Sequence, residues 1–133
     1  MTRKAKKFDV QAIYEIIHIA SDYGILLLRT KDDLQKCIDE FWVEELDGRV
    51  VACCALAVYS QKLAEIRSMA VLPDYQGKGI ASGLLQKCLD TAKKKGIYEV
   101  LTITNRPNIF DKKGFGVQLD GQSALIYRTG NGL

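Results

Sequence analysis

Histidine and cysteine are scarce in this 133-residue sequence, which has one histidine, His18, and four cysteines. Cys53 and Cys54 are adjacent in a predicted strand, so their side chains point to opposite faces. Cys37 and Cys88 fall on the apolar faces of predicted helices. This distribution excludes a disulfide framework and a metal site built from clustered histidines and cysteines. We expect reduced core thiols and no metal cofactor.

The sequence also lacks a long apolar run. The longest, Val50 to Tyr59, is too short to span a bilayer. The basic N-terminus, Met1 to Lys7, is not followed by the apolar core of a signal peptide. Together with reduced cysteines, these absences predict a cytoplasmic protein that does not enter a membrane.

A strong excess of charge is missing too. The net charge is +3 and the lysines are scattered or placed at helix ends, which argues against a nucleic-acid-binding surface. Hydrophobic residues make up 47% of the chain and charged residues 26%, as in folded globular proteins. We therefore expect one domain, residues 1–133, with its own core.

The most informative segment is Gln76 to Ala81, where an apolar strand stops and a helix begins. Gly77 and Gly79 can take positive φ, and the first turn of the helix, opening at Ile80, has several backbone N–H groups without partners. Residues 80–83 supply no acidic side chain to offset the helix dipole. The segment therefore predicts a phosphate-binding site.

The spacing of the glycines separates this segment from two other phosphate-binding motifs. A dinucleotide fingerprint would have Gly or Ala where Ser82 stands, and a P-loop would have Lys-Ser/Thr after a longer spacer. The remaining alternative is a glycine turn that only connects a strand to a helix.

Periodicity and turn signals predict an α/β fold with a mixed sheet. Antiparallel strands come first, and a strand that follows the crossover helix pairs in parallel. The expected elements begin with a helix from Val10 that Asp9 caps and Gly24 ends, an extended link, Ile25 to Arg29, and a helix capped by Thr30, with Leu34, Cys37, Ile38 and Phe41 on one face. Three strands follow, 41–46, 49–59 and 64–71; the two-residue Asp47-Gly48 turn joins the first two as a hairpin, and a turn near Gln61-Lys62 leads into the third. The chain then forms a helix from Ile80 that stops at Gly96, a strand, 98–104, a short helix, 107–113, and two closing strands around Asp120-Gly121.

Strand 64–71 carries alternating side chains. Regular alternation places Glu65, Arg67, Met69 and Val71 on one face of the sheet and the intervening residues on the other. A ligand that contacts Val71 would then lie on the same face as Glu65.

Three segments of this chain resemble signatures of the GCN5-related N-acetyltransferases (GNAT). Gln76-x-x-Gly79-x-Ala81 resembles the pyrophosphate-binding Q/R-x-x-G-x-G/A motif of that family. The strand from Ala64 to Val71 and the run from Phe110 to Phe115 look like two further signatures, and the order of elements matches over residues 9–128. The resemblance implies the GNAT acyl-CoA N-acyltransferase fold, with a parallel central pair of strands around the cofactor helix.

The resemblance also implies acetyl-CoA as the co-substrate. Backbone groups of Met69 and Val71 would pair with its pantetheine arm, and the turn that starts at Gln76 would hold its pyrophosphate. The implied cofactor-binding residues are Met69, Ala70, Val71, Gln76, Gly77, Lys78, Gly79, Ile80 and Ala81.

A narrower resemblance is to the acetyltransferase half of bacterial N-acetylglutamate synthases. The segments that carry it are 23–30, 41–43, 51–56, 64–66 and 101–107. It implies an acidic amino acid such as L-glutamate as the acceptor, with its carboxylates on Arg29 and Arg106, and a role in arginine biosynthesis. The amino-acid-kinase-like domain of the longer synthases is lacking, so we expect no arginine feedback through it.

The same comparison assigns catalytic roles. Glu65 matches the strand glutamate that acts as general base, through a water molecule. The alternative for Glu65 is an ion pair with Arg67 or a lysine. Phe110 stands where many family members have a tyrosine that protonates the departing thiolate. We therefore expect water or another group to supply that proton, with Tyr127 and Tyr98 as alternatives.

Other functions remain compatible with the sequence. The acceptor could be another small amine or a peptide N-terminus, and the same fold could serve as a non-catalytic acyl-CoA sensor. A structural or interaction domain with a fortuitous glycine turn is a further alternative. The sequence leaves open whether the chain works alone or as a homodimer.

Overall fold

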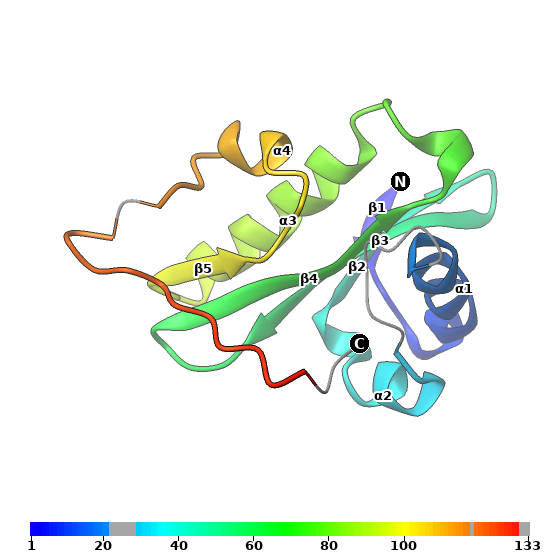
Figure 1. The fold of residues 1–133 in the computed structure, drawn as a ribbon. Coiled ribbons are helices and arrows are strands. Elements are labelled where there is room, and N and C mark those ends of the chain that lie inside the picture. The colour runs from blue at the N-terminus through cyan, green and yellow to red at the C-terminus, as the bar shows by residue number, and fades with distance from the viewer. Residues whose placement is uncertain (22–28, 118, 131–133) are drawn as a thin grey trace. The chain divides into compact units, whose positions relative to one another are not determined.

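The computed structural model describes residues 1–21, 29–117 and 119–130, and the chain forms two compact units, residues 1–103 and 104–133. The first unit contains a five-stranded sheet in the order β1-β2-β3-β4-β5 (Figure 1). The strands are β1 (Thr2–Lys4), β2 (Phe41–Leu46), β3 (Arg49–Val58), β4 (Leu63–Val71) and β5 (Glu99–Thr102). Neighbours from β1 to β4 are antiparallel, and β4 and β5 are parallel. The predicted mixed sheet is confirmed.

Turn chemistry fixes the β2–β3 hairpin. Asp47 and Gly48 form its two-residue turn, with φ of 51° and 75°. Positive φ at both central residues is the geometry that matches the twist of the flanking strands, and Asp-Gly favours it. The predicted hairpin is therefore confirmed, as are the second turn before β4 and the parallel crossover to β5.

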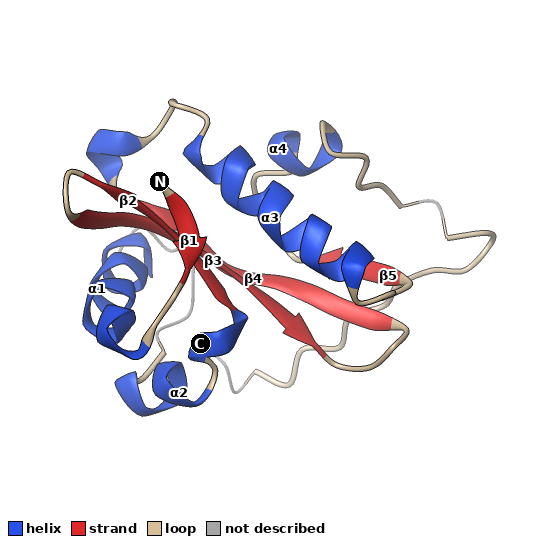
Figure 2. Cartoon of the chain, turned by 180° about the vertical axis from the view of Figure 1, so that it is seen from behind, coloured by secondary structure: helices blue, strands red, loops and turns tan. Residues whose placement is uncertain are grey.

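Helices cover both faces of this sheet (Figure 2). The helices α1 (Val10–Ser21) and α2 (Lys31–Lys36) lie on one face, and α3 (Ile80–Lys94) lies on the other. Side-chain contacts agree with this arrangement. Cys88 of α3 approaches Cys54 of β3, with 3.7 Å between the sulfur atoms. Phe41, which pairs with the residue after Cys54, points to the α1/α2 face and packs under Arg29, which precedes α2.

The core of the first unit consists of apolar side chains from both layers. Its largest fully buried side chains are those of Ile13, Ile17, Leu34, Phe41, Val43, Val51, Cys53, Cys54, Leu84, Leu85 and Cys88. Cys53, Cys54 and Cys88 are buried free thiols, as expected from the sequence, whereas the free thiol of Cys37 is only half-buried. The helical spacing of the apolar residues in α1 and α3 places them against the sheet.

The segment between α1 and β2 differs in part from expectation. The Oγ1 of Thr30 accepts a hydrogen bond from the N–H of Asp33 at 3.0 Å, so the predicted cap of α2 is confirmed. The helix is shorter than predicted, because Phe41 belongs to β2 and a 3-10 turn, η2 (Ile38–Glu40), precedes it. The predicted stop at Gly24 and all of the predicted extended link except Arg29 lie outside the described residues.

The N-terminal strand was not predicted. Arg3 of β1 donates hydrogen bonds to both carboxylate oxygens of Asp9, at 2.8 and 2.9 Å, and forms an ion pair with Glu45 of β2 at 2.8 Å. Asp9 is only 3% exposed, and its carboxylate also accepts the N–H of Lys6. Asp9 ends a 3-10 turn, η1 (Lys7–Asp9), that runs directly into α1, so its carboxylate reaches back to Lys6 instead of forward as a cap.

The second unit contains α4 (Asn108–Asp111). Its Phe110 packs edge-on against Phe115, with 5.2 Å between the ring centroids. The two predicted closing strands are not formed by the described residues, where only a single bridge joins Leu119 and Gln122. Leu125 and Tyr127 are both 89% exposed. This segment therefore buries no apolar face that would stabilise strand pairing.

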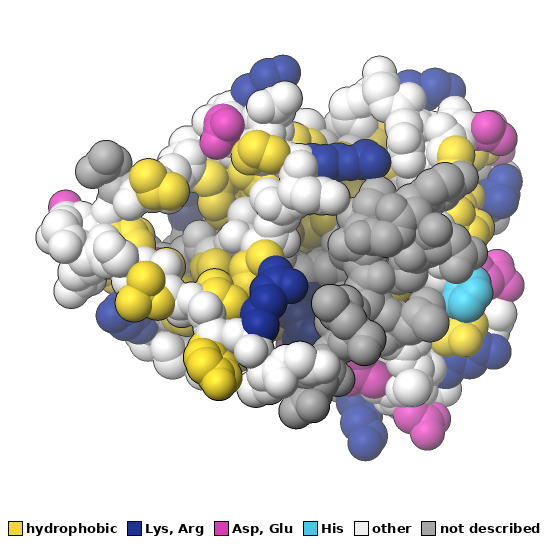
Figure 3. Space-filling view, in the orientation of Figure 1, with side chains coloured by type: hydrophobic (Ala, Val, Ile, Leu, Met, Phe, Trp, Pro, Cys, Tyr) yellow, Lys and Arg dark blue, Asp and Glu magenta, His cyan; other side chains and the backbone are white. Residues whose placement is uncertain are grey.

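Charged side chains are distributed over the surface. On the face drawn in Figure 3, Lys and Arg side chains lie at separate points among other residue types. Among the described helices, none has the length and apolar character needed to cross a membrane.

We expect the Arg3–Asp9 pair to dominate the stability of the N-terminal strand. Burial alone would raise the pKa of Asp9, but the hydrogen bonds from Arg3 and Lys6 lower it below its ordinary value. Asp9→Asn should reduce the free energy of unfolding by about 2 kcal/mol at pH 7, because it removes the charge-assisted hydrogen bonds between Arg3 and the buried carboxylate and leaves Arg3 paired with Glu45 alone.

The sign of the pH dependence follows from this lowered pKa. Asp9 stabilises the fold fully above its unfolded pKa of about 4, and this contribution is lost as the pH falls through the lower folded value. Urea unfolding at several pH values should show the wild type and Asp9→Asn converging below pH ~4. Asp47→Asn, at an exposed hairpin turn, is the control. A difference that does not change with pH would contradict this account.

Candidate active site

A β-bulge interrupts β4 in the middle of the sheet. Cys53 of β3 pairs with Ala70, but Ala55 pairs with Arg67, so three residues of β4 span two of β3. Ser68, inside this interval, has φ of 52°, in the left-handed region. The extra residue reverses the side-chain alternation beyond it.

The bulge corrects one expectation from the sequence. Glu65 and Arg67 do share a face, because their partners Ala57 and Ala55 are two residues apart on β3. Val71 pairs with Ala52, whose side chain lies on the opposite face of β3 from that of Ala55. Glu65 therefore faces α1 and α2, whereas Val71 faces α3. Regular alternation had placed Glu65 and Val71 together.

The two parallel strands, β4 and β5, separate just before the bulge. Pairing of β4 with β5 ends at Ile66 and Thr102, although β4 continues to Val71. The N–H of Leu72 donates to the carbonyl of Val51, so the adjacent pair that includes Val71 is of the non-hydrogen-bonded type. The backbone groups of Val71 therefore point away from β3, toward the side on which β5 has separated.

The glycine turn follows at the end of β4. After a 3-10 turn, η3 (Pro73–Tyr75), Gly77 has φ of 77° and Gly79, which precedes α3, has φ of 81°. The predicted positive φ values are confirmed. A Cβ at either position would meet no atom within 4 Å, so the backbone conformation, and not packing, requires glycine here.

The turn also presents the features expected of an anion site. No side chain caps α3, and its first turn carries no acidic residue. The Nε2 of Gln76 donates to the carbonyl of Val71 at 3.0 Å and so joins the turn to the end of β4. The Nζ of Lys78 lies 5.5 Å from the ring centroid of Tyr75.

Glu65 is half-buried and is bound to a tyrosine. The hydroxyl of Tyr59 donates to its Oε1 at 2.6 Å. The ion pairs of the described residues do not include Glu65, so the expected alternative of a salt bridge with Arg67 or a lysine is not formed there. Burial and the bond to Glu65 raise the pKa of Tyr59, so its hydroxyl remains a donor at neutral pH.

The guanidinium of Arg29 donates hydrogen bonds to three side chains. Its Nε donates to Asp33 Oδ2 at 2.8 Å, its Nη1 to Ser68 Oγ at 2.9 Å and its Nη2 to Cys37 Sγ at 2.9 Å. The guanidinium also lies 5.6 Å from the ring centroid of Phe41. The side chain is 9% exposed. Burial would lower the pKa of Arg29, but the bond to Asp33 and nearby charges raise it, so the group stays charged.

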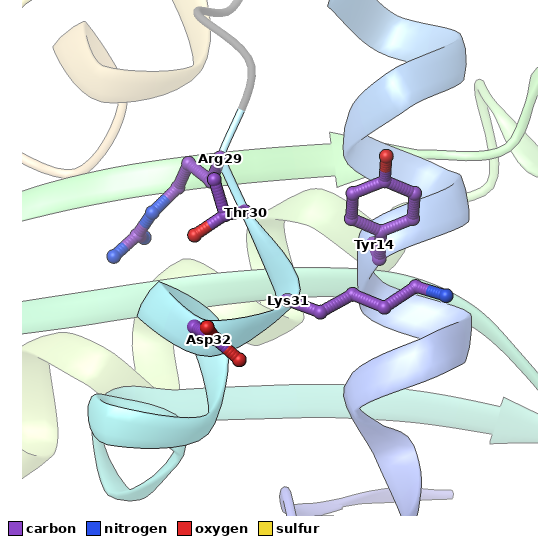
Figure 4. A pocket seen from close by; sticks show the side chains of 5 residues that line it. All are labelled: Tyr14, Arg29, Thr30, Lys31 and Asp32. Carbon is purple, nitrogen blue, oxygen red and sulfur yellow. The ribbon is translucent and has the colours of Figure 1, made fainter.

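An open hollow of about 480 Å³ borders this arginine (Figure 4). It is lined by Tyr14, Arg29, Thr30, Lys31 and Asp32. Figure 4 shows the Arg29 side chain extending away from Tyr14, while Lys31 lies beside the tyrosine, with its Nζ 5.1 Å from the ring centroid. Of the predicted site residues, only Arg29 lines this hollow.

The remaining predicted site residue lies in the second unit. Arg106 precedes α4, and its backbone N–H donates to Thr104 Oγ1 at 3.0 Å. Among the described residues, no group of three His, Cys, Asp or Glu side chains is close enough to bind a metal.

The sequence analysis missed two parts of the site. Tyr59 follows an apolar strand and has no motif around it, and only the β3–β4 hairpin brings it to Glu65. The bulge at Ser68 has no local signal, because the apolar alternation of β4 continues through it.

The chain belongs to the acetyltransferase (GNAT) family, whose model matches residues 10–111. An uncharacterized N-acetyltransferase of Chlorobaculum tepidum is 36% identical over 113 residues, which cover 85% of this chain and 73% of that protein. The protein is accordingly an N-acetyltransferase, as the sequence motifs predicted.

The resemblance to amino-acid acetyltransferases is also confirmed. The amino-acid acetyltransferase of Proteus mirabilis is 36% identical over 115 residues, which cover 85% of this chain and only 26% of that enzyme. The chain thus spans about a quarter of the length of these relatives.

Two solved structures show the same fold with CoA bound. A Mycobacterium tuberculosis protein in complex with CoA and NLQ has a TM-score of 0.82 and 33% identity, covering 90% of this chain and 73% of that one. N-acetylglutamate synthase from Neisseria gonorrhoeae, complexed with CoA and N-acetyl-glutamate, has a TM-score of 0.78 and 29% identity, covering 85% of this chain and 27% of that one. The predicted fold is confirmed.

Proposed function

We propose that residues 1–133 form a single N-acetyltransferase domain that moves an acetyl group from acetyl-CoA to the α-amine of an acidic amino acid, with L-glutamate as the leading candidate. The observation that carries this proposal is the end of β4. There the strand separates from β5, bulges at Ser68 and leads into an acid-free helix start. Glu65 lies on the same strand, shortly before the bulge.

The cofactor would occupy the separated edge of β4 and the glycine turn. The backbone of Val71 points to that edge, as the pairing of an extended pantetheine arm requires. The pyrophosphate would sit on the N–H groups at the start of α3, where the helix dipole favours negative charge. The residues proposed to contact acetyl-CoA are Met69, Ala70, Val71, Gln76, Gly77, Lys78, Gly79, Ile80 and Ala81.

Glu65 would act as the general base. It takes a proton from the substrate ammonium, through water, and the neutral amine then attacks the thioester carbonyl. The new C–N bond forms as the C–S bond breaks, the nitrogen releases its second proton to water to give the neutral amide, and the thiolate of CoA leaves. Phe110 has no hydroxyl to protonate that thiolate, so water or another group supplies the proton. Phe110 itself packs against Phe115.

Carboxylate recognition would come from arginine. Arg29 is buried, charged and next to the bulge, and its two Nη atoms each carry a second N–H. Arg106 is the second candidate. The relatives named amino-acid acetyltransferase support an amino-acid acceptor. With glutamate as the acceptor, the enzyme would work in the cytoplasm in arginine biosynthesis. A different small amine, a peptide N-terminus or a non-catalytic acyl-CoA sensor are the alternatives.

A valine at position 79 tests the cofactor site. Gly79→Val strains a backbone with positive φ and places a side chain where the pyrophosphate would approach, so it should weaken acetyl-CoA binding at least about 30-fold, whereas Lys78→Ala should have little effect. Gly48→Val is the matched control, because Gly48 has a similar φ and the same lack of neighbours but lies in the β2–β3 turn. Calorimetric titration of the folded variants measures the affinities. Equal acetyl-CoA affinity in all three variants would show that the cofactor does not bind at this turn.

Glutamine at position 65 tests the base. Glu65→Gln should lower kcat at neutral pH by roughly 10²- to 10⁴-fold, because an amide cannot take the proton. Acetyl-CoA binding should not change. Glu15→Gln, on the exposed side of α1, is the control. Initial rates of thiol release across a pH series give the answer, and full activity of Glu65→Gln at every pH would refute the assignment.

A substrate screen tests the acceptor class. Amino acids, polyamines, aminoglycosides and short peptides are offered with acetyl-CoA, and glutamate should give the highest kcat/KM. Arg29→Ala and Arg106→Ala should each lower that value by about 100-fold, since each removes a charged hydrogen bond. Arg29→Lys guards against loss of folding, and Arg49→Ala, on the exposed hairpin, is the control.

The screen also separates the alternatives. Preference for a cationic amine, or unchanged kcat/KM for glutamate in both arginine variants, would exclude the acidic amino acid. Acetyl-CoA binding without turnover of any amine would favour the sensor.

A further inference from the structure

Two arginines, Arg29 and Arg67, lie on the face of the sheet that carries Glu65, and they differ in how easily a ligand could reach their guanidinium groups. Arg29 is 9% exposed and its guanidinium donates to three partners, one of them the carboxylate of Asp33. Arg67 is exposed, and it takes part in none of the ion pairs found among the described residues. A soluble carboxylate can therefore reach Arg67 without displacing a carboxylate that is already bound.

The strand geometry places Arg67 next to the proposed base. Glu65 and Arg67 are two residues apart on one face of β4, about 7 Å along the strand. Arg67 is also the first residue of β4 after its pairing with β5 ends, and it directly precedes the bulge. It therefore lies where the thioester and the amine would meet.

Arg67 does not form an ion pair with Glu65, although both lie on the same face of β4. The Glu65 carboxylate accepts the hydroxyl of Tyr59 instead. Burial raises the pKa of Tyr59, as does Glu65, and the charge and hydrogen bond of Arg67 lower it, so these three side chains lie close together. The other nearby acid is Glu40, whose pKa is raised by burial and lowered by both Arg29 and Arg67.

We propose that Arg67 binds the α-carboxylate of the acceptor and so restricts the enzyme to free α-amino acids. This inference rests on the function proposed above. In an α-amino acid the amine and the α-carboxylate are attached to one carbon, so an amine placed at Glu65 brings the carboxylate to the adjacent side chain on the same face. The planar fork of a guanidinium matches both oxygens of that carboxylate. Arg29 is then left for the side chain of the substrate.

The proposal specifies which kinetic constant responds. The α-carboxylate does not change during acetyl transfer, so Arg67 binds the ground state and the transition state equally. Loss of such an interaction raises KM with little change in kcat. Peptide N-termini and polyamines lack the α-carboxylate and would not gain from Arg67.

Three amines that differ by one group test this proposal: L-glutamate, L-glutamine and L-isoglutamine, in which the α-carboxylate is an amide. The wild type should acetylate glutamate with a kcat/KM about 100-fold above that for isoglutamine, whereas glutamine, which keeps the α-carboxylate but lacks the side-chain carboxylate, should be used less well than glutamate because of its side chain alone. Arg67→Gln should raise KM for the first two by about that factor and leave isoglutamine unchanged. Arg67→Lys should give an intermediate loss, because it keeps the charge and not the fork.

Control variants and outcomes separate this inference from the proposed function. Arg49→Gln should leave all three substrates unchanged, and thermal unfolding should show that every variant is folded. Equal use of glutamate and isoglutamine by the wild type, or an Arg67→Gln enzyme that loses the same factor on all three amines, would overturn the role of Arg67 and leave the proposed function standing. An enzyme that acetylates none of the three would overturn both.

Discussion

The bulge in β4 is the constraint on which the rest of the site depends. One extra residue, Ser68, turns the backbone into the left-handed region, at a cost of about 1–2 kcal/mol for a residue other than glycine. The bulge reverses the side-chain alternation, so residues before and after Ser68 at the same spacing face opposite sides of the sheet. Before it, Glu65 and Arg67 face α1 and α2; after it, Val71 faces α3 and the strand leads into the glycine turn. A straight strand would place the proposed base, Glu65, and the end of the proposed cofactor path on one face.

Contacts with Arg29, which precedes α2, stabilise the bulge. Ser68 accepts a hydrogen bond from Arg29, and its carbonyl accepts the thiol of Cys53 from the neighbouring strand. Arg29 is in turn fixed by Asp33 and by the ring of Phe41. The strained residue thus has partners on both sides, which is how a left-handed serine can persist inside a sheet. The same contacts give α2 a role in the site, although it carries no predicted catalytic residue.

Local signals explain what could be predicted from the sequence. The Asp47-Gly48 turn, the apolar spacing of α3 and the two glycines at 77 and 79 act over a few residues, and the hairpin, the helix and the positive φ values predicted from them are confirmed. Features fixed by distant partners could not be found in this way. β1 depends on the contacts of Arg3 with Asp9 and Glu45, and the link between Glu65 and Tyr59 depends on how the β3–β4 hairpin closes. Alternation alone predicted two closing strands near Asp120, and without a buried face they did not form.

The two arginines Arg29 and Arg67 differ in how freely their guanidinium groups can bind a ligand. A guanidinium that is already fixed, as Arg29 is by Asp33 and Ser68, loses little conformational entropy when a ligand binds, but only its remaining N–H groups can be used. An exposed guanidinium such as Arg67 offers its full fork but must be ordered on binding, at about 0.5–1.5 kcal/mol for a flexible side chain. A substrate with two carboxylates would use both. On the proposed assignment, the fixed Arg29, from the segment before α2, would bind the carboxylate distant from the amine, and the exposed Arg67, on β4, would adapt to the carboxylate beside the amine.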